Sequence, residues 1–489
     1  MILILGLTVF VLFLFHELYW KRRHLPPGPT PWPILGNLMA LTNPKPGYEA
    51  FIRWSNEYGP VFTFWLATKP FVIITSYDIM KETFIKDGDT YSDKQLNGNE
   101  TGGFYGVLDT NGKMWREHRR FTLSQLRDLG LGKDLMQEKI LLEVEELHNF
   151  LDGHLGENLD LPKVLDRSVG NIINLTLFNK RFDTSQRDEF RYLKDLLDGM
   201  FSVVSEFRYF IQHLIPWTSK FIRPTLFEKS REYTTRLHEF FKQQIEEHRK
   251  EVDFESEMSM DYVESYLKEQ KKRETEGDME TFCDKQLLGM VFDLYTAGLI
   301  TTTTTLTWGF SYYLYHPEVQ LKIKEELDQV IASSRLISTA DRNELPYLTA
   351  FINETQRCAN IIPMNLLHVT KKDTTIGGMK VAKGTGVIAQ ISALMMDEKV
   401  FPKSLDFNPE RFLENGKLKK VEELVPFSIG KRQCLGEGLA RMELFLFFAN
   451  LFNRYEMETG EGGLPSLDKS NANFVVPRKF NVVLRRRHE

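Results

Sequence analysis

The chain has 489 residues and a formal net charge of −5 at pH 7. A mildly acidic chain lacks the surplus of basic residues that nucleic-acid-binding proteins carry, so we exclude nucleic acid as a partner. Its cysteines, Cys283, Cys358 and Cys434, are too few and too scattered for a disulfide framework or a zinc site, which fits a reducing compartment. Length alone would allow about three domains, yet no glycine- or serine-rich linker divides the chain.

The N-terminus predicts a membrane anchor. Residues 1–15 are almost wholly apolar, and with residues 16–20 the segment reaches the roughly 20 residues needed to cross a bilayer. Lys21, Arg22 and Arg23 follow this segment, whereas a cleaved signal peptide would carry its basic residues in front. The positive-inside rule then places the body of the protein in the cytosol. Residues 21–37 are basic and proline-rich, which predicts a stiff connector.

Short strands and a helix are predicted next. Val61–Leu66 and Phe71–Thr75 have strand composition, and the glycine-rich segment Asn97–Gly106 predicts a loop. Trp115 and Arg119 are four residues apart on a probable helix, so their N–H donors point from one face. Taken alone, this pair is better interpreted as an arginine packed on an indole at a helix surface.

Two later segments have unusual composition. Ser202–Phe227 includes the apolar stretch Leu214–Phe227, which could dip into a membrane or lie in the core, and the sequence leaves both open. Lys268–Glu280 is a run of mixed charges that predicts a solvated loop.

Lys285–Tyr315 predicts a long central helix. It contains Ala297, Gly298 and five consecutive threonines from Thr301 onward, which are poor helix formers. Threonine hydroxyls can also bond back to the preceding turn and bend a helix. We therefore expect a locally opened helix with a hydroxyl beside the opening. Further on, Glu354 and Arg357 are spaced i, i+3, which alone indicates an ordinary surface ion pair of little energetic value.

The segment Phe427–Gly436 reads F-S-I-G-K-R-Q-C-L-G. Cys434 lies between Gly430 and Gly436, just before a helix predicted over Leu435–Tyr455. The N–H groups and dipole of a helix start favour an anion, so we expect a thiolate here, suited to bind a metal or act as a nucleophile. The glycines would let a flat group approach the backbone, and Arg432 could reach a carboxylate on it. A buried core cysteine is the alternative.

The pattern F-x-x-G-x-R-x-C-x-G resembles the haem-binding loop of the cytochrome P-450 superfamily, whose cysteine thiolate ligates the haem iron. Matching elements extend over essentially the whole chain, and the closest resemblance is to microsomal family-two-type enzymes. The resemblance implies a mainly α fold with small β-sheets (α+β) and a long central helix over a Cys-ligated haem. It also implies a single catalytic domain over residues 38–489, preceded by an anchor (1–20) and a hinge (21–37).

The resemblance also implies roles for individual residues. Cys434 would be the axial ligand of the haem iron. Further haem contacts are implied at Trp115, Arg119, Ala297, Gly298, His368, Phe427, Gly430, Arg432 and Gly436. A buried structural network is implied at Glu354, Arg357 and Arg411. Substrate-pocket positions are implied at Phe104, Val107, Asp293, Ile300, Ile361, Leu366 and Phe474, although Phe104 and Val107 could equally be ordinary loop residues.

The central helix departs from the family at one position. Relatives have an acid followed by threonines, a pair that helps to deliver protons during oxygen activation. Here the acid is replaced by Ile300, and only Thr301 and Thr302 remain as candidate catalytic residues. Three explanations stay open: the threonines order water by themselves, a nearby acid such as Asp293 substitutes, or the reaction needs no relay.

The implied function is that of a haem-thiolate monooxygenase of the endoplasmic reticulum membrane. It would take electrons from NADPH through a flavoprotein reductase, with cytochrome b5 as a second candidate partner, and oxidise an apolar small molecule: a lipid, a steroid or a xenobiotic. Docking would use basic residues through complementary charge: Arg116, Arg120, Lys420 and Lys431. Two alternatives remain, namely a haem-thiolate isomerase or dehydratase that acts on a peroxide without a reductase, and a non-catalytic haem-binding or sensing protein.

Overall fold

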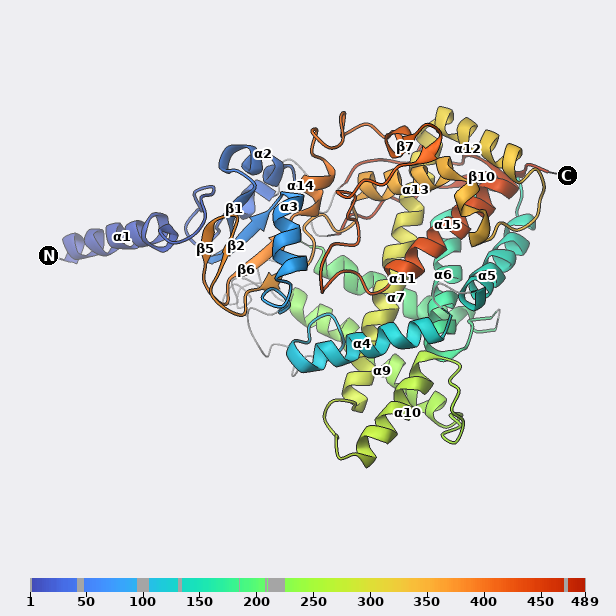
Figure 1. Cartoon of the computed structure of the whole chain (residues 1–489), viewed down its shortest axis with the longest axis horizontal. Coiled ribbons are helices and arrows are strands. Elements are labelled where there is room, and N and C mark those ends of the chain that lie inside the picture. Colours follow the sequence, from blue (N-terminus) through green and yellow to red (C-terminus); the bar gives the residue numbers. More distant parts are fainter. Residues whose placement is uncertain are drawn as a thin grey trace.

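A computed structural model describes residues 2–41, 48–94, 105–130, 134–183, 185–206, 209, 225–469 and 474–488. Helices make up most of the described chain (Figure 1). The α-helices are α1 (Ile2–Leu18), α2 (Glu49–Tyr58), α3 (Tyr77–Met80), α4 (Gly112–Asp128), α5 (Asp134–Asp152), α6 (Leu161–Phe178), α7 (Arg187–Val204), α9 (Leu226–Arg249), α10 (Tyr262–Thr275), α11 (Asp284–Tyr315), α12 (Pro317–Val330), α13 (Pro346–Ala359), α14 (Ile391–Met395) and α15 (Glu437–Arg454).

The strands are short. They are β1 (Val61–Leu66), β2 (Lys69–Ile74), β3 (His368–Val369), β4 (Thr374–Ile376), β5 (Met379–Val381), β6 (Gly386–Ala389), β7 (Leu413–Glu414), β8 (Lys417–Leu418), β9 (Tyr455–Thr459) and β10 (Val482–Arg486). The largest sheet has the order β1-β2-β6-β3 and lies on the N-terminal side of the body. Within it, β2 runs parallel to β6 and antiparallel to β1. The predicted mainly α fold with small sheets is confirmed.

The long helix α11 forms the centre of the core and agrees with the predicted central helix. It packs against α6, α9, α13 and α15. Buried residues lie all round α11 rather than along one stripe, which is typical of a helix inside a domain. Because α15 begins three residues after Cys434, this packing fixes α11 relative to the cysteine loop.

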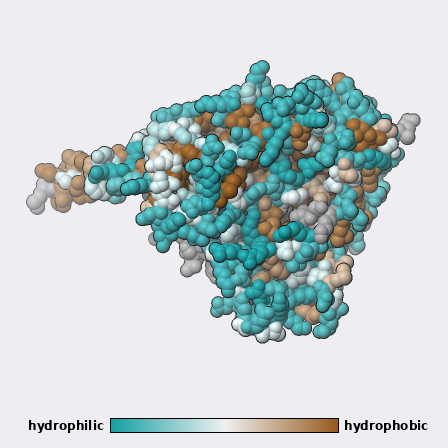
Figure 2. Space-filling model, in the orientation of Figure 1, coloured by the Kyte–Doolittle hydropathy of each residue, from teal (hydrophilic) through white to brown (hydrophobic). Residues whose placement is uncertain are grey.

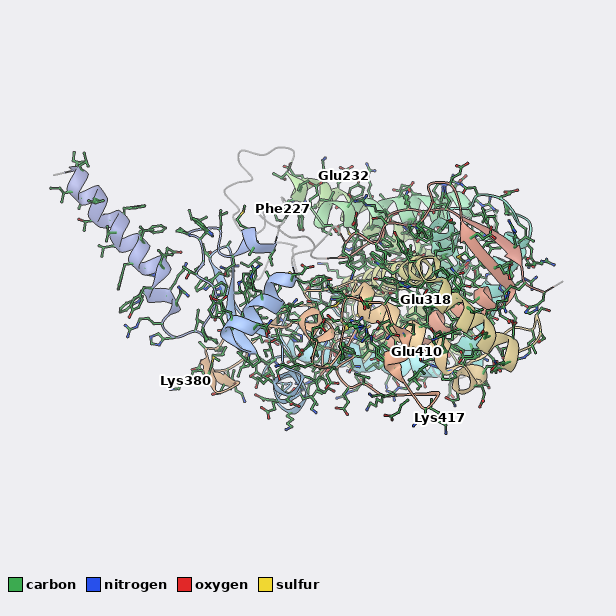
Figure 3. All side chains as sticks on the ribbon, turned by 90° about the horizontal axis from the view of Figure 1, so that it is seen from above. Phe227, Glu232, Glu318, Lys380, Glu410 and Lys417 are labelled. Carbon is green, nitrogen blue, oxygen red and sulfur yellow. The ribbon has the colours of Figure 1, made fainter. Side chains whose placement is uncertain are left out.

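The helix α1 stands clear of the body in two perpendicular views (Figure 1 and Figure 3). None of its residues is buried, and apolar residues lie along it (Figure 2). Among the described residues, the segment Ile2–Arg22, with a mean hydropathy of 2.2, is the one helix long and apolar enough to cross a membrane. This finding supports the predicted anchor. Most of the apolar stretch Leu214–Phe227 lies outside the described residues.

The prediction for the charge run Lys268–Glu280 is wrong. The charge run Lys268–Glu280 was expected to be a solvated loop, but α10 (Tyr262–Thr275) extends through more than half of it. Opposite charges spaced i, i+4 stabilise a helix, and α10 contains such pairs. They are Lys268 with Glu264 at 2.8 Å and Arg273 with Glu269 at 2.6 Å.

Candidate active site

The cysteine loop is closed by backbone hydrogen bonds and leaves the thiol accessible. The N–H of Cys434 donates to the carbonyl of Phe427 at 3.0 Å, and the Cys434 side chain is exposed. Gly430 has φ +85°, and a Cβ there would lie 2.1 Å from the Phe84 carbonyl oxygen. A Cβ on Gly436 would meet no atom within 4 Å among the described residues. Gly430 therefore serves close packing against the chain itself, and only Gly436 faces open space.

The protein alone does not hold Cys434 as a thiolate, in contrast to our expectation from the helix start. Although the thiol is accessible from one side, the protein packed around the loop displaces enough water to raise the pKa of Cys434. The backbone N–H groups of Gly436 and Glu437 and the charge of Arg119 offset this rise only in part. A coordinating metal ion would deprotonate such a thiol outright. The loop therefore suits metal binding better than free nucleophilic chemistry.

Arg432 connects the cysteine loop to the preceding part of the chain. Its guanidinium lies over the ring of Trp115, 4.0 Å from the centroid. Its N–H groups donate to the carbonyls of Ser92 (2.7 Å), Val107 (3.1 Å) and Thr110 (2.6 Å) and to Oδ1 of Asn111 (3.0 Å). An arginine has five N–H donors, so one remains for a carboxylate. Arg432 therefore uses most of its donors to bind the protein itself. The sequence had indicated only that it could reach a carboxylate.

His368 and Lys94 form a second pair beside this clamp. Nδ1 of His368 lies 2.7 Å from the Tyr91 carbonyl, to which it donates, and Nε2 lies 3.4 Å from Nζ of Lys94. A neutral imidazole carries one N–H, so with Nδ1 donating to Tyr91 the Nε2 atom accepts from Lys94. The haem contact implied for His368 stays a prediction. Burial, with added repulsion from Arg432, lowers the pKa of Lys94 to about 7.

Among the described residues of the site, cations outnumber the carboxylates that act on them, Asp93 and Asp109. Lys94, Arg119 and Arg432 are desolvated together, and the pKa of each is lowered mainly by burial. Asp109 offsets this for Lys94 only in part. Nearby, the buried Nε1–H of Trp115 has no hydrogen-bond partner among the described residues. An unsatisfied buried donor costs about 1–3 kcal/mol, so these groups fit a ligand that brings carboxylates.

A haem fits this arrangement, because it combines an iron centre with two carboxylate groups. Arg119 donates to the carbonyl of Gln433 at 2.6 Å, which places its charge beside Cys434. Phe427 is covered by Arg441, whose guanidinium lies 4.8 Å from the ring centroid. Sequence reasoning missed Lys94. No spacing signals it, because a bridge between Asp93 and Val369 in the folded chain brings it to the site.

The helix α11 is continuous through its threonines, which corrects the expected local opening. The Thr301 hydroxyl donates to the Ala297 carbonyl at 2.7 Å and remains exposed. Thr302 is buried and lies beside Glu443 of α15, whose pKa burial raises to about 8. A Cβ on Gly298 would lie 2.6 Å from Cδ1 of Ile173, so this glycine allows α6 to pack closely against α11. The haem contacts implied for Ala297 and Gly298 stay predictions.

Asp293 holds a loop in place. Its Oδ2 accepts the backbone N–H groups of Val107 at 2.7 Å and Leu108 at 2.9 Å. The amide of Gln286 pairs with both backbone groups of Gly106, each at 3.0 Å. Burial raises the pKa of Asp293 to about 7, and the two N–H donors oppose the rise. Because it is occupied in this way, Asp293 is a poor substitute for the acid missing at position 300.

A cavity of about 1140 Å³ lies against one face of α11 and is bordered by α6 and α7. Of the predicted pocket residues, Ile300 and Phe474 line it. Four others, Val107, Asp293, Ile361 and Leu366, lie outside its lining, and Phe104 is not among the described residues. The cavity-lining residues of α11 recur at helical spacing, and this pattern could have predicted them from the sequence. They are Ile300, Thr303, Thr304 and Thr307.

The family model for cytochrome P450 matches residues 26–484. The chain belongs to the cytochrome P450 family. Human cytochrome P450 2A6 is 34% identical over 94% of this chain and 92% of that protein. Rat cytochrome P450 2C23 is 36% identical over 90% of this chain and 88% of that protein. Human cytochrome P450 2J2 is 35% identical over 91% of this chain and 88% of that protein.

Membership of the family confirms the resemblance seen in the cysteine loop. The protein is therefore an oxidoreductase of the monooxygenase type, and the family implies haem as its cofactor. This assignment argues against the alternative of a non-catalytic haem-binding or sensing protein.

This P450 contains a buried charged network centred on α13. Nε of Arg357 donates to Glu354 at 2.7 Å and Nη2 at 2.8 Å, while Nε of Arg411 donates to the same carboxylate at 2.9 Å. The side chains of Glu354 and Arg357 are 0% exposed. Both arginines also donate to backbone carbonyls of the segment 395–406. The network therefore holds the segment 395–406 against α13.

Proposed function

We propose that this P450 inserts one oxygen atom from O₂ into an apolar small molecule, a lipid, steroid or xenobiotic, with electrons from NADPH delivered by a flavoprotein reductase. The observation that carries the proposal is the accessible Cys434 next to desolvated cations and the unpartnered Nε1–H of Trp115. This combination suits a thiolate-ligated haem and no simpler ligand that we can name.

Each residue of the site has a separate role in the proposed function. Cys434 would hold the iron, while Trp115, Arg119, Lys94 and the remaining N–H of Arg432 would hold the carboxylates. The haem, when bound, supplies redox-active iron to which a thiolate donates electron density, and this favours O–O cleavage. The Thr301 hydroxyl donates a hydrogen bond to the carbonyl oxygen of Ala297. The hydroxyl oxygen can therefore still accept a hydrogen bond from water.

The test uses the full-length protein, a flavoprotein reductase, NADPH and isotopically labelled dioxygen, with a library of apolar compounds. We expect product that carries one labelled oxygen atom and forms only when NADPH and reductase are both present. Rearrangement of an organic peroxide without reductase would instead favour an isomerase or dehydratase, toward which Ile300 points. NADPH consumption that no compound stimulates would contradict the proposal.

We further propose that the protein is anchored in the endoplasmic reticulum membrane with its catalytic domain, residues 38–489, in the cytosol. Basic residues at the surface would dock a reductase or cytochrome b5 through complementary charge. Arg116 and Arg120 are exposed on α4, and the Lys420 side chain is 85% exposed. Lys431 pairs with Asp89 at 2.5 Å and is thus partly neutralised.

Removal of residues 1–23 should not release the protein completely from membranes. Trp32, Ile34 and Met39 are exposed apolar residues just after the anchor, with Trp32 at 69% exposure. They would add to any contact made by the apolar stretch 214–227. We expect the truncated protein to sediment partly with membranes in high salt, where electrostatic attraction is screened. Recovery of all of it in the supernatant would show that α1 is the whole attachment.

A further inference from the structure

A second, smaller cavity lies where the anchor meets the body of the protein, and we call it the junction cavity. It has a volume of about 200 Å³ and is enclosed by the end of α1, the connector that follows α1, and β1. In Figure 1 this junction lies on the side of the β1-β2-β6-β3 sheet. Among the described residues, the charged side chains in its lining are Arg22 and Arg23, and no acid lines it. The junction cavity is therefore positively charged.

The connector is held against β1 and is not a loose tether. The N–H of Thr63 donates to the Pro27 carbonyl at 2.8 Å, and the Thr63 hydroxyl donates to the Pro26 carbonyl at 2.7 Å. Gly28 lies so close to the strand that a Cβ there would be 2.1 Å from the Thr63 carbonyl oxygen. One wall of the junction cavity therefore has a fixed shape.

Basic residues hold the end of α1 to the same wall. Nζ of Lys21 lies 4.6 Å from the centroid of the Trp65 ring. The guanidinium of Arg22 donates to the Gly28 carbonyl at 3.0 Å and to the Thr30 hydroxyl at 3.2 Å. The end of α1, the connector and β1 are thus joined to one another around the junction cavity.

Both arginines keep N–H donors for a ligand. Arg22 also donates to the Leu18 carbonyl at 3.2 Å, so at most three of its five N–H groups are used. The Arg23 side chain makes no hydrogen bond among the described residues. Neither arginine has an ion-pair partner in the described part of the chain, and Glu17 of α1 pairs with Lys21 instead. The two charges are therefore available to an anion.

The junction cavity lies at the depth of lipid headgroups. The segment Ile2–Arg22 has 21 residues and a mean hydropathy of 2.2. A helix of that length measures about 30 Å, which matches the hydrocarbon core of a bilayer. Tyr19 and Trp20 lie at its body end, and such aromatic residues favour the membrane interface. The guanidinium of Arg23 lies over their rings, 6.0 and 5.2 Å from the centroids.

The chemistry of the lining fits a phospholipid phosphate. Guanidinium groups bind phosphate through paired, charge-assisted hydrogen bonds. An anionic leaflet also attracts basic residues next to a membrane-spanning helix. The uncharged part of the lining is mostly apolar or aromatic, which suits the glycerol and first methylene groups of a lipid. These residues are Leu18, Tyr19, Leu25, Pro26, Pro27 and Trp65.

We propose that the junction cavity binds the phosphate group of an anionic phospholipid through Arg22 and Arg23. The inference rests on the membrane anchoring proposed above and goes beyond it, since an anchor by itself requires only an apolar helix. A loose basic tether would explain the two charges. It would not explain their enclosure by a connector that is hydrogen-bonded to β1.

The first test measures the lipid that stays bound to the full-length protein. The protein is taken from bilayers of phosphatidylcholine and phosphatidylserine into mild detergent and analysed by native mass spectrometry. We expect one retained phosphatidylserine per chain. The double variant Arg22→Gln, Arg23→Gln should retain about 10-fold less, because a hydrogen bond to a charged group is worth about a factor of ten or more in affinity. Arg53→Gln is the matched control, since Arg53 is exposed on α2 outside the lining, and it should retain the lipid.

The second test separates the cavity from its charges. Gly28→Ala keeps every charge but pushes the connector away from β1, so lipid retention should fall as in the arginine variant. Gly153→Ala is the control, because a Cβ there would meet no atom nearer than 3.5 Å among the described residues, and retention should not change. Normal haem content in each variant would show that the body is intact. Unchanged retention in Gly28→Ala would overturn the inference, since charge alone would then hold the lipid.

Inorganic phosphate distinguishes a lipid headgroup from a free anion. Added in excess over the lipid, it should not displace phosphatidylserine, and displacement would overturn the assignment to a lipid. Equal retention of phosphatidylcholine and phosphatidylserine by the wild type would overturn it as well. A full-length protein that does not enter bilayers would contradict the proposed anchoring, whereas one that enters them and retains no lipid would contradict only this inference.

Discussion

Replacement of Cys434 by serine is expected to abolish the strongly red-shifted Soret band of the reduced carbonyl complex. The thiolate donates electron density to the iron that a serine hydroxyl does not supply. The measurement is the difference spectrum of the reduced protein with and without carbon monoxide. An unchanged band in Cys434→Ser would end the assignment of Cys434 as the axial ligand.

Cys283→Ser is the matched control for this substitution. Cys283 is half-buried just before α11 and makes no side-chain hydrogen bond as the cap of that helix. Its replacement should leave the band and the haem content unchanged. Loss of the band in both variants would indicate general damage to the fold rather than loss of a ligand.

Glu354→Ala is expected to yield little haem-loaded protein and to lower the thermal unfolding temperature sharply. It leaves Arg357 and Arg411 without the carboxylate that both bind. Removal of one partner of a buried ion pair costs about 3–5 kcal/mol. This is a large part of the about 5–15 kcal/mol that separates a folded domain from its unfolded state. Thermal unfolding and haem content are the measurements.

Glu410→Ala provides the comparison, because Glu410 immediately precedes Arg411 and pairs with Lys322 at the surface. Both side chains of that pair are nearly half exposed, at 48% and 47%. Exposed pairs are worth about 0–1 kcal/mol, so this variant should resemble the wild type. Equal stability of Glu354→Ala and Glu410→Ala would show that the buried network does not support the fold.

The sequence alone was sufficient where structure depends on local pattern. The cysteine loop, the strand Val61–Leu66 and the limits of α11 follow from residue types at close spacing, and the family assignment rests on the same kind of signal. The charge run in α10 was predicted wrongly, although local too, because its i, i+4 pairs were not weighed. The long apolar helix at the N-terminus was also predictable, since length and hydropathy are properties of the sequence itself.

Only the tertiary structure decided which groups face one another in the site. Lys94 reaches His368 across 274 positions, and Asp166 meets Lys194 because α6 and α7 border one cavity. Asp293 could be a spare acid by sequence, but two backbone N–H groups from a distant loop occupy it. A side chain's partners, burial and pKa depend on segments brought together by packing, and one-dimensional spacing does not contain that information.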